Sequence, residues 1–232
     1  MLDFSLFDRR RYPTVSVREG YREWLASYEG TVEDEMDLVL LDALESVRWG
    51  AVERAVDLGC GTGRTGAWLR ARGIARLDGV DLTPEMLEIA RSRKIYDRLV
   101  QADAFATGLE GDAYDLVTSC LMEEHLRDLR PLYRETSRLL RQNGIYVLVG
   151  YHPHFIMTAG MPTHFDRATG ESVAIETYVH LVSDHVIAAR AAGFWLTEMR
   201  ERLVDDHWIA LKPGWAQYRS HPVSFAMAWQ KR

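Results

Sequence analysis

The stretch VDLGCGTGRTGAWL, residues 56–69, has three glycines at alternate positions between a short apolar run and a segment with helical spacing. Glycine at a strand-to-helix turn allows a tight bend and lets a ligand come close to the backbone. Gly59, Gly61 and Gly63 therefore predict a ligand-binding loop at the end of a first β-strand.

Strand-like and helix-like segments alternate around this loop. Five short apolar runs predict strands at residues 54–59, 76–82, 98–103, 114–121 and 145–153. Three segments with helical spacing lie between them, at residues 64–73, 83–94 and 129–144. We expect the last of these helices to end at Asn143 and Gly144. Alternation of this kind predicts a parallel sheet with helices on both faces and a ligand beyond the carboxyl ends of its strands.

The two ends of the chain follow other patterns. Residues 18–47, including Val32, have helical spacing with a break and a new N-cap at Gly30 and Thr31. After Pro153, a turn at Thr169 and Gly170 predicts a hairpin. The final segments predict a helix, a strand, a long loop and a second strand, at residues 184–194, 195–204, 205–222 and 223–232. The whole pattern predicts an α/β, Rossmann-like fold with a seven-stranded sheet, mostly parallel with an antiparallel last strand.

Composition excludes several classes of protein. The 232 residues are 47% hydrophobic and carry a formal charge of -6, a balance that disfavours non-specific binding to nucleic acid. The sequence has no apolar stretch of the length that a membrane span needs. The first residues lack the basic-then-apolar order of a secretory signal, and two cysteines do not indicate a disulfide scaffold. We expect a cytoplasmic protein.

Acidic residues at the strand ends indicate the chemistry of the ligand. The spacing of the loop glycines is one residue tighter than in the dinucleotide fingerprint, and Asp57 would repel a pyrophosphate but attract an ammonium or sulfonium cation. Asp81 ends the second strand, where a carboxylate can bind both ribose hydroxyls, and Asp103 ends the third, where an acid can accept from an adenine amino group. These residues favour a nucleoside with an amino-acid tail and no phosphate.

Several motifs resemble those of a known family. VDLGCGTG, GVDLTPEML, QADA, YDLVTSCLMEEHL and LLRQNGIYVLV follow one another within residues 50–150. They resemble the class I S-adenosylmethionine-dependent methyltransferases, with most similarity to the small-molecule branch that includes the ubiquinone and menaquinone methyltransferases. The resemblance implies a single domain with S-adenosylmethionine as cofactor and S-adenosylhomocysteine as its product. Within it we expect an N-terminal helical cap, a cofactor-binding core, a lid-like insertion, and a C-terminal helix with strands, at residues 1–50, 51–152, 153–183 and 184–232.

The same resemblance assigns residues to the cofactor. These are Tyr21, Tyr28, Asp57, Gly59, Cys60, Gly61, Asp81, Leu82, Met86, Asp103, Ala104, Cys120 and Leu121. Simpler roles stay open for some of them. Asp57 could only orient the loop amides, Leu82 and Met86 could be core residues, and Tyr28 could only pack. Cys60 and Cys120 are expected to be buried thiols rather than a redox pair.

Methyl transfer from a sulfonium is a direct displacement, so a protein mainly aligns the reactants and keeps water away. A general base helps when the acceptor must lose a proton. Glu124 and His125 follow the fourth strand, and the resemblance to N-methyltransferases with a glutamate and a histidine at this place makes them catalytic candidates. The alternative is that His125 only fixes the loop. His152, His154 and His164 are expected to line the acceptor pocket, and no tight Cys/His spacing predicts a metal site.

The acceptor is expected to be a small organic molecule. The exit of the fourth strand lacks the Asn-Pro-Pro-Tyr type of run found in nucleic-acid amino-methyltransferases, and no proline precedes Cys120. We expect methylation of oxygen or nitrogen ahead of carbon, and we expect no nucleic-acid partner. Two alternatives are a methyltransferase that reaches RNA or protein through a partner and a non-catalytic S-adenosylmethionine-binding protein. The insertion at 153–183 could instead form a homodimer contact.

Overall fold

The computed structural model describes residues 2–31 and 36–232. Its main sheet has seven strands in the order β11-β12-β7-β6-β3-β4-β5. The strands from β7 to β5 pair in parallel, whereas β12 is antiparallel to both β7 and β11. The predicted Rossmann-like sheet with an antiparallel last strand is confirmed. The strands are β3 Arg54–Leu58, β4 Arg76–Asp81, β5 Arg98–Gln101, β6 Tyr114–Cys120, β7 Leu140–Tyr151, β11 Phe194–Leu203 and β12 Pro222–Lys231.

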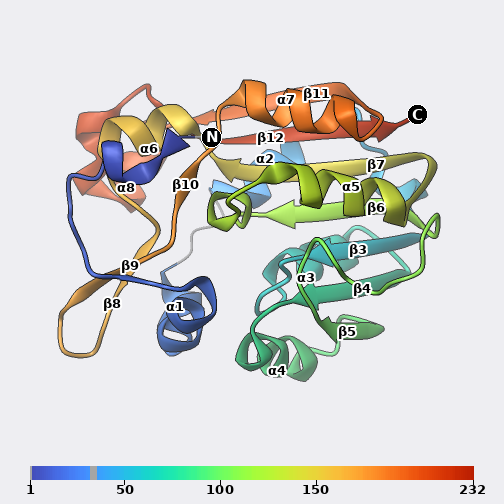
Figure 1. The fold of residues 1–232 in the computed structure, drawn as a ribbon, viewed down its shortest axis with the longest axis horizontal. Coiled ribbons are helices and arrows are strands. Elements are labelled where there is room, and N and C mark those ends of the chain that lie inside the picture. Colours follow the sequence, from blue (N-terminus) through green and yellow to red (C-terminus); the bar gives the residue numbers. More distant parts are fainter. Residues whose placement is uncertain (1, 32–35) are drawn as a thin grey trace.

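Helices cover both faces of this sheet (Figure 1). Successive residues of a strand point to opposite faces, and Leu116 and Val117 of β6 accordingly belong to different core clusters. Val117 shares its cluster with Tyr133, and Leu116 shares the other with Leu41 and Leu69. β6 is therefore buried on both sides, as its continuous apolar run predicts. The helices of this part are α2 Leu38–Ala43, α3 Arg64–Ala71, α4 Pro84–Ser92, α5 Leu129–Leu139 and α7 Val182–Ala191.

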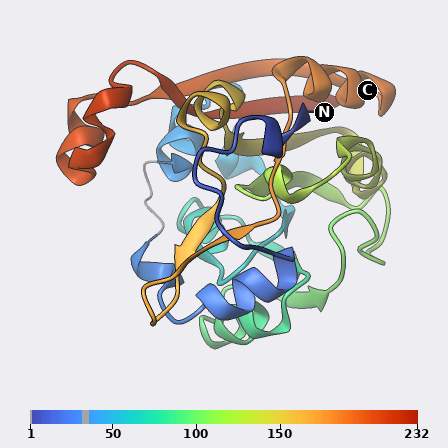
Figure 2. The ribbon, with the colours of Figure 1, turned by 60° about the vertical axis from the view of Figure 1, so that its left-hand side comes forward.

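Two segments that are distant in sequence form one cover, which lies beyond the carboxyl ends of the parallel strands (Figures 1 and 2). β2 pairs in parallel with β9, β8 pairs with β9 in an antiparallel hairpin, and β1 pairs with β10. The hairpin predicted at Thr169 and Gly170 is thus confirmed. The cover consists of β1 Leu2–Asp3, β2 Thr14–Val15, α1 Val17–Trp24, α6 Pro153–Ala159, β8 His164–Asp166, β9 Ser172–Ile175 and β10 Tyr178–Val179.

Two expectations, about the end of a helix and about a loop, need correction. The helix after β6 ends at Leu139 rather than at Asn143, because Leu140 is already extended and pairs with Tyr114. The segment between the last two strands is not a plain loop, since it contains α8 Asp206–Leu211 and a 3-10 helix, Pro213–Tyr218. Asp205 starts α8 by accepting a hydrogen bond from the backbone N–H of Trp208, whose side chain is buried.

The N-terminal helical region is shorter than its spacing predicts. The break near Gly30 is present as a 3-10 helix, Tyr28–Gly30. The next described α-helix is α2, where the Asp37 side chain accepts from the N–H of Leu38 as its cap. The helix start predicted after Thr31 falls on residues outside the described ranges. Val32 lies outside the described residues. No helix in the described ranges is both long enough and apolar enough to cross a bilayer.

Gly66 on α3 leaves space for the ring of Tyr96 near the glycine loop. A Cβ atom at Gly66 would lie 2.2 Å from the Tyr96 hydroxyl oxygen and 2.4 Å from its Cζ. The same hydroxyl donates a 2.9 Å hydrogen bond to Oδ2 of Asp57 at the end of β3. The absence of a side chain at position 66 therefore allows Tyr96 to join α3 to this buried carboxylate.

We predict that Gly66→Ala destabilises the protein. Alanine in a helix normally stabilises by about 1 kcal/mol relative to glycine. Here we expect a net loss of roughly 1–3 kcal/mol, because the new methyl group displaces Tyr96. Urea unfolding measures the difference. Gly50→Ala is the control, since its Cβ would meet no atom within 4 Å, and its effect should stay within about 0.5 kcal/mol. A Gly66→Ala protein as stable as the wild type would contradict this account.

Candidate active site

The glycine loop closes around the carboxylate of Asp81. Gly59, Gly61 and Gly63 have φ angles of 68°, 51° and 94°, which side chains disfavour. The N–H of Gly61 donates to Oδ2 of Asp81 at 2.8 Å, and the N–H of Thr83 donates to Oδ1 at 2.8 Å. Burial raises the pKa of Asp81, and these backbone donors oppose the shift. Asp81 thereby joins the loop after β3 to the start of α4.

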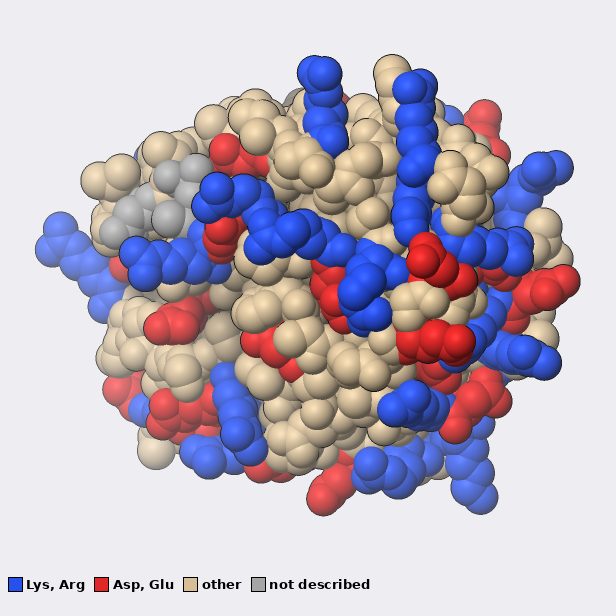
Figure 3. Space-filling view, turned by 45° about the vertical axis from the view of Figure 1, so that its right-hand side comes forward, with Lys and Arg blue, Asp and Glu red and all other residues tan. Residues whose placement is uncertain are grey.

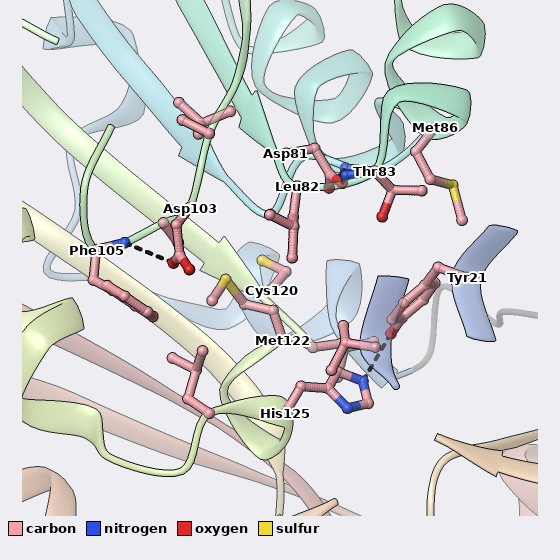
Figure 4. A pocket seen from close by; sticks show the side chains of 18 of the residues that line it. Tyr21, Asp81, Leu82, Thr83, Met86, Asp103, Phe105, Cys120, Met122 and His125 are labelled. Atoms are coloured by element: carbon pink, nitrogen blue, oxygen red, sulfur yellow. Dashed lines mark hydrogen bonds between the residues drawn. The ribbon is translucent and has the colours of Figure 1, made fainter. Parts of the chain in front are cut away.

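A central cavity of about 310 Å³ opens beside this loop (Figure 4). Most of the residues that the sequence assigns to the cofactor line it. Those that do are Tyr21, Tyr28, Gly59, Gly61, Asp81, Leu82, Met86, Asp103, Ala104, Cys120 and Leu121, together with His125. In Figure 4 Asp81 and Met86 lie on one side of the cavity, and His125 and Tyr21 lie on the other.

Asp57 and Cys60 lie behind the loop and are not among the residues that line the cavity. Asp57 is 1% exposed and accepts hydrogen bonds from the hydroxyls of Tyr96 and Thr118. Its described donors are side chains, so it fixes the ends of neighbouring elements rather than the loop amides. Burial raises the pKa of Asp57 to about 7, against the opposing effect of the two hydroxyl donors. Cys60 is buried, and burial raises the pKa of its thiol.

Two further cavities continue from the central one. A neck cavity of about 70 Å³ shares Tyr21, Tyr28 and Leu121 with the central cavity. An outer cavity of about 370 Å³ shares Tyr151 and Trp215, among others, with the neck. The three therefore lie in series, from the glycine loop to the underside of the cover.

The three histidines expected in the acceptor pocket separate in the structure. His164 lines the outer cavity. His152 and His154 line none of the three cavities. Nδ1 of His152 accepts from the N–H of His154 and so caps α6, and its Nε2 donates to Glu201 at 3.0 Å. The rings of His152 and His154 lie next to each other, with centroids 6.4 Å apart, but both lie away from the cavities at the start of α6.

His125 and Tyr21 form a hydrogen-bonded pair at the junction of the central and neck cavities. Nδ1 of His125 lies 2.7 Å from the carbonyl oxygen of Glu176, which can only accept, so Nδ1 carries a hydrogen. Nε2 of a neutral imidazole then accepts from the Tyr21 hydroxyl at 2.9 Å. Burial raises the pKa of Tyr21. Oε1 of Glu124 lies 3.7 Å from the same Nε2 and lines the neck.

Glu123 and Glu124 are adjacent buried acids, 3% and 2% exposed. Each has a buried Oε2 atom with no hydrogen-bond partner among the described residues. Burial raises the pKa of Glu123, and the charge of Glu124 adds to the shift. A Cβ atom at Gly150 would lie 1.8 Å from Oε1 of Glu123, so this glycine gives the carboxyl group its space. Among the described residues, no three His, Cys, Asp or Glu side chains are arranged to bind a metal ion.

Sequence reasoning did not identify several residues that line the central cavity. Thr83 and Met122 directly follow residues that it did identify, so adjacency in the chain could have found them. Phe105 and Arg127 lie in loops after β5 and β6. Tyr178 belongs to the 153–183 insertion expected over the acceptor side, and the structure places it at the central cavity, on β10, which pairs with β1.

Comparisons with known proteins agree with this site. Residues 56–148 match the sequence model of the family described as "Methyltransferase domain". This match supports a methyltransferase domain of the class I S-adenosylmethionine-dependent type at these residues. S-adenosylmethionine is the cofactor of this domain. The matched range contains the glycine loop, Asp81, Asp103 and the Glu123–His125 segment.

Individual relatives extend the match over part of the chain. This chain is 29% identical over 189 residues to an uncharacterized methyltransferase, AN0656, of Emericella nidulans. The match covers 69% of this chain and 65% of the relative. It is 33% identical over 162 residues to a malonyl-[acyl-carrier protein] O-methyltransferase of Halorhodospira halophila, covering 67% of this chain and 52% of the relative. The chain thus spans less than two thirds of both relatives.

A solved structure shows the same fold. The crystal structure of an S-adenosylmethionine-dependent methyltransferase from Mesorhizobium loti superposes with a TM-score of 0.66 at 24% identity. The match covers 85% of this chain and 98% of that one. The similarity of fold therefore extends beyond residues 56–148.

The buried carboxyl of Asp57 predicts a pH-dependent stability. Its pKa of about 7 in the folded protein lies above the unfolded value of about 3.9. Its contribution to stability is therefore complete below about pH 4 and is lost as the pH rises to about 7. Compared with Asp57→Asn, the wild type should lose roughly 1–3 kcal/mol of unfolding free energy between about pH 5 and 7. Urea unfolding at each pH measures this, with the exposed Glu88→Gln as control. Parallel pH curves for the wild type and Asp57→Asn would show that Asp57 does not titrate in this range.

Proposed function

We propose that the protein transfers the methyl group of S-adenosylmethionine to a nitrogen or oxygen atom of a small organic acceptor. The observation that carries this proposal is the series of central, neck and outer cavities, with Tyr21 and His125 at the first junction. One cavity accommodates the cofactor and the next two accommodate the acceptor. The residues between them are those that direct displacement needs to align the reactants and to accept a proton.

The central cavity fits the cofactor residue by residue. The Asp81 carboxylate, held by two backbone donors, can accept from the ribose hydroxyls with its remaining lone pairs. Leu82 and Phe105 are each 41% exposed, and their apolar surface at this cavity matches the faces of an adenine ring. A Cβ atom at Gly61 would meet no atom within 4 Å, so the loop leaves open space for the methionine end. When bound, S-adenosylmethionine supplies an activated methyl group on a sulfonium.

A proton can leave the acceptor through Tyr21. Its hydroxyl donates to His125, so the oxygen keeps lone pairs that can accept from an acceptor in the neck. As Tyr21 receives that proton, its own hydrogen passes to Nε2 of His125. Glu124, 3.7 Å from Nε2, stabilises the resulting imidazolium. In this arrangement His125 acts as the base and Tyr21 is the group that touches the acceptor.

The shape of the acceptor side favours a molecule with a small reacting group and a larger body. The neck of about 70 Å³ admits only a few heavy atoms, whereas the outer cavity of about 370 Å³ is comparable with small-ligand pockets. The cover forms much of the outer wall through Phe155 and Phe165. We therefore propose that residues 153–183 act as a lid over the acceptor. None of the relatives described above is named as a quinone methyltransferase, and the acceptor proposal does not rest on that branch.

The activity is tested with methyl-labelled S-adenosylmethionine and a metabolite extract. We expect label in a small-molecule fraction and none in protein or RNA. Label in protein or RNA would favour the alternative of a macromolecular substrate. Binding of S-adenosylhomocysteine without any transfer would favour a binding protein.

Asp81→Ala tests the position of the cofactor. Two hydrogen bonds to a carboxylate are lost, each worth about 1.5–3 kcal/mol, so affinity for S-adenosylhomocysteine should fall at least about tenfold. Calorimetric titration measures this affinity. Asp112→Ala, at an exposed position before β6, is the matched control and should bind normally. Unchanged affinity in Asp81→Ala would show that the ribose does not bind to this carboxylate.

Tyr21→Phe and His125→Gln test the proton path. Because general-base catalysis contributes about 10²–10⁴ in rate, each variant should slow transfer to an extracted acceptor at least about a hundredfold. Affinity for S-adenosylhomocysteine should change only a few fold. The double variant should be no slower than the slower single variant, since the two groups act in one path. If the losses in rate of the two single variants multiplied in the double variant, the two residues would not act in one proton path. A normal rate in either single variant would show that its residue takes no part in the proton path.

A further inference from the structure

The neck cavity contains the buried carboxylate of Glu124, which lies beside the carboxyl group of Glu123. Glu124 is 2% exposed and lines the neck. Its Oε1 accepts a 3.3 Å hydrogen bond from Thr163 and lies 3.7 Å from Nε2 of His125. Its Oε2 is buried without a hydrogen bond among the described residues. A buried carboxylate oxygen left in this state costs free energy, so the site favours a ligand that donates to it.

Aromatic rings form most of the remaining wall of the neck. Tyr21, Trp24 and Tyr28 come from the N-terminal part of the cover, with ring centroids of neighbours 5.1–6.0 Å apart. Trp208 and Trp215 come from the segment before β12, and their centroids are 5.2 Å apart. Tyrosine and tryptophan faces attract cations, and this attraction is strongest where water is excluded. The combination of a carboxylate and several aromatic rings is therefore typical of a site for an organic cation.

The charged side chains around the neck also favour a cationic ligand. Glu123 is buried next to Glu124 in the chain, and Asp81 lines the adjoining cavity. Lys212 also lines the neck, with Nζ 5.9 Å from the centroid of Trp215, and Arg127 lines the far part of the central cavity. On the face drawn in Figure 3, acidic and basic side chains are interspersed. At the neck, the buried carboxylate of Glu124 disfavours a second anion.

We propose that the neck is a subsite for an ammonium group and that the acceptor is an organic amine, bound as a cation with its body in the outer cavity. This inference rests on the proposed function and narrows it to N-methylation. The N–H groups of the ammonium donate to Oε2 of Glu124, and its carbon substituents contact the faces of Tyr28 and Trp24.

The reaction balances with groups already present. One ammonium proton passes to the oxygen of Tyr21, and the Tyr21 hydrogen passes to Nε2 of His125. The freed lone pair on nitrogen forms the new N–C bond as the C–S bond breaks, leaving a neutral thioether. The methylated amine is again a cation, and the proton held on His125 leaves to solvent. A carboxylate acceptor would need no proton transfer and would have to bind beside Glu124 as a second anion.

The test compares three probes of similar shape in the presence of S-adenosylhomocysteine: phenethylamine, its neutral analogue propylbenzene and the anion 3-phenylpropanoate. Calorimetric titration near neutral pH should show that the amine binds at least about tenfold more tightly than either of the others. Glu124→Gln should remove most of this preference, because one charge-assisted hydrogen bond is worth about tenfold or more in affinity. Glu88→Gln removes an equivalent charge from the surface of α4 and should bind all three probes as the wild type does.

The same titrations separate the inference from the proposed function. If S-adenosylhomocysteine itself does not bind, the proposed function fails. If it binds and the amine shows no preference, or no binding at millimolar concentration, only the ammonium subsite fails. Tight 3-phenylpropanoate binding that is lost in Lys212→Met would assign the neck to an anion and overturn the inference. Weaker binding of S-adenosylmethionine but not of S-adenosylhomocysteine in Glu124→Gln, with amine binding unchanged, would assign Glu124 to the sulfonium and also overturn it.

Discussion

The carboxylate of Asp81 is the constraint on which the site depends. It accepts the N–H of Gly61 with one oxygen and the N–H of Thr83 with the other, so two loops that follow neighbouring strands have one fixed separation. That separation determines the width of the central cavity. The glycines of the loop allow this geometry because all three adopt positive φ angles. Loop, strand end and helix start are thus positioned by one side chain, which we also propose as the partner of the ribose.

The acceptor side is built in a different way. Its walls come from the N-terminal part of the chain, from residues 153–183 and from the segment before β12. Strand pairing, aromatic packing and the Arg167–Glu23 ion pair are among the contacts that join them. The central cavity is formed by loops at the ends of adjacent strands. An enzyme of this fold can therefore change its acceptor by changing the cover while its cofactor site stays the same.

The sequence predicted the mostly parallel sheet with its antiparallel last strand from local rules, and the family resemblance supplied most residues of the central cavity. Alternating apolar runs and helices determine a parallel sheet, and the carboxyl ends of its strands meet at one edge. It did not predict that Asp57 lies behind the loop, since burial by Tyr96 and Thr118 depends on packing between distant elements. His152 was misplaced because a helix begins after it. The contact of Tyr21 with His125 joins residues 104 positions apart, which no local pattern encodes.

The pairing within the cover has a consequence for synthesis of the chain. β1 and β2 are made first, but their partners Val179 and Ile175 are made only after the parallel strands β3 to β7 are complete. While the ribosome is translating the core, the N-terminal segment has no strand to pair with. The central cavity can therefore begin to assemble before the cover is complete. Formation of the cover is a late step in folding, because it depends on the synthesis of β9 and β10.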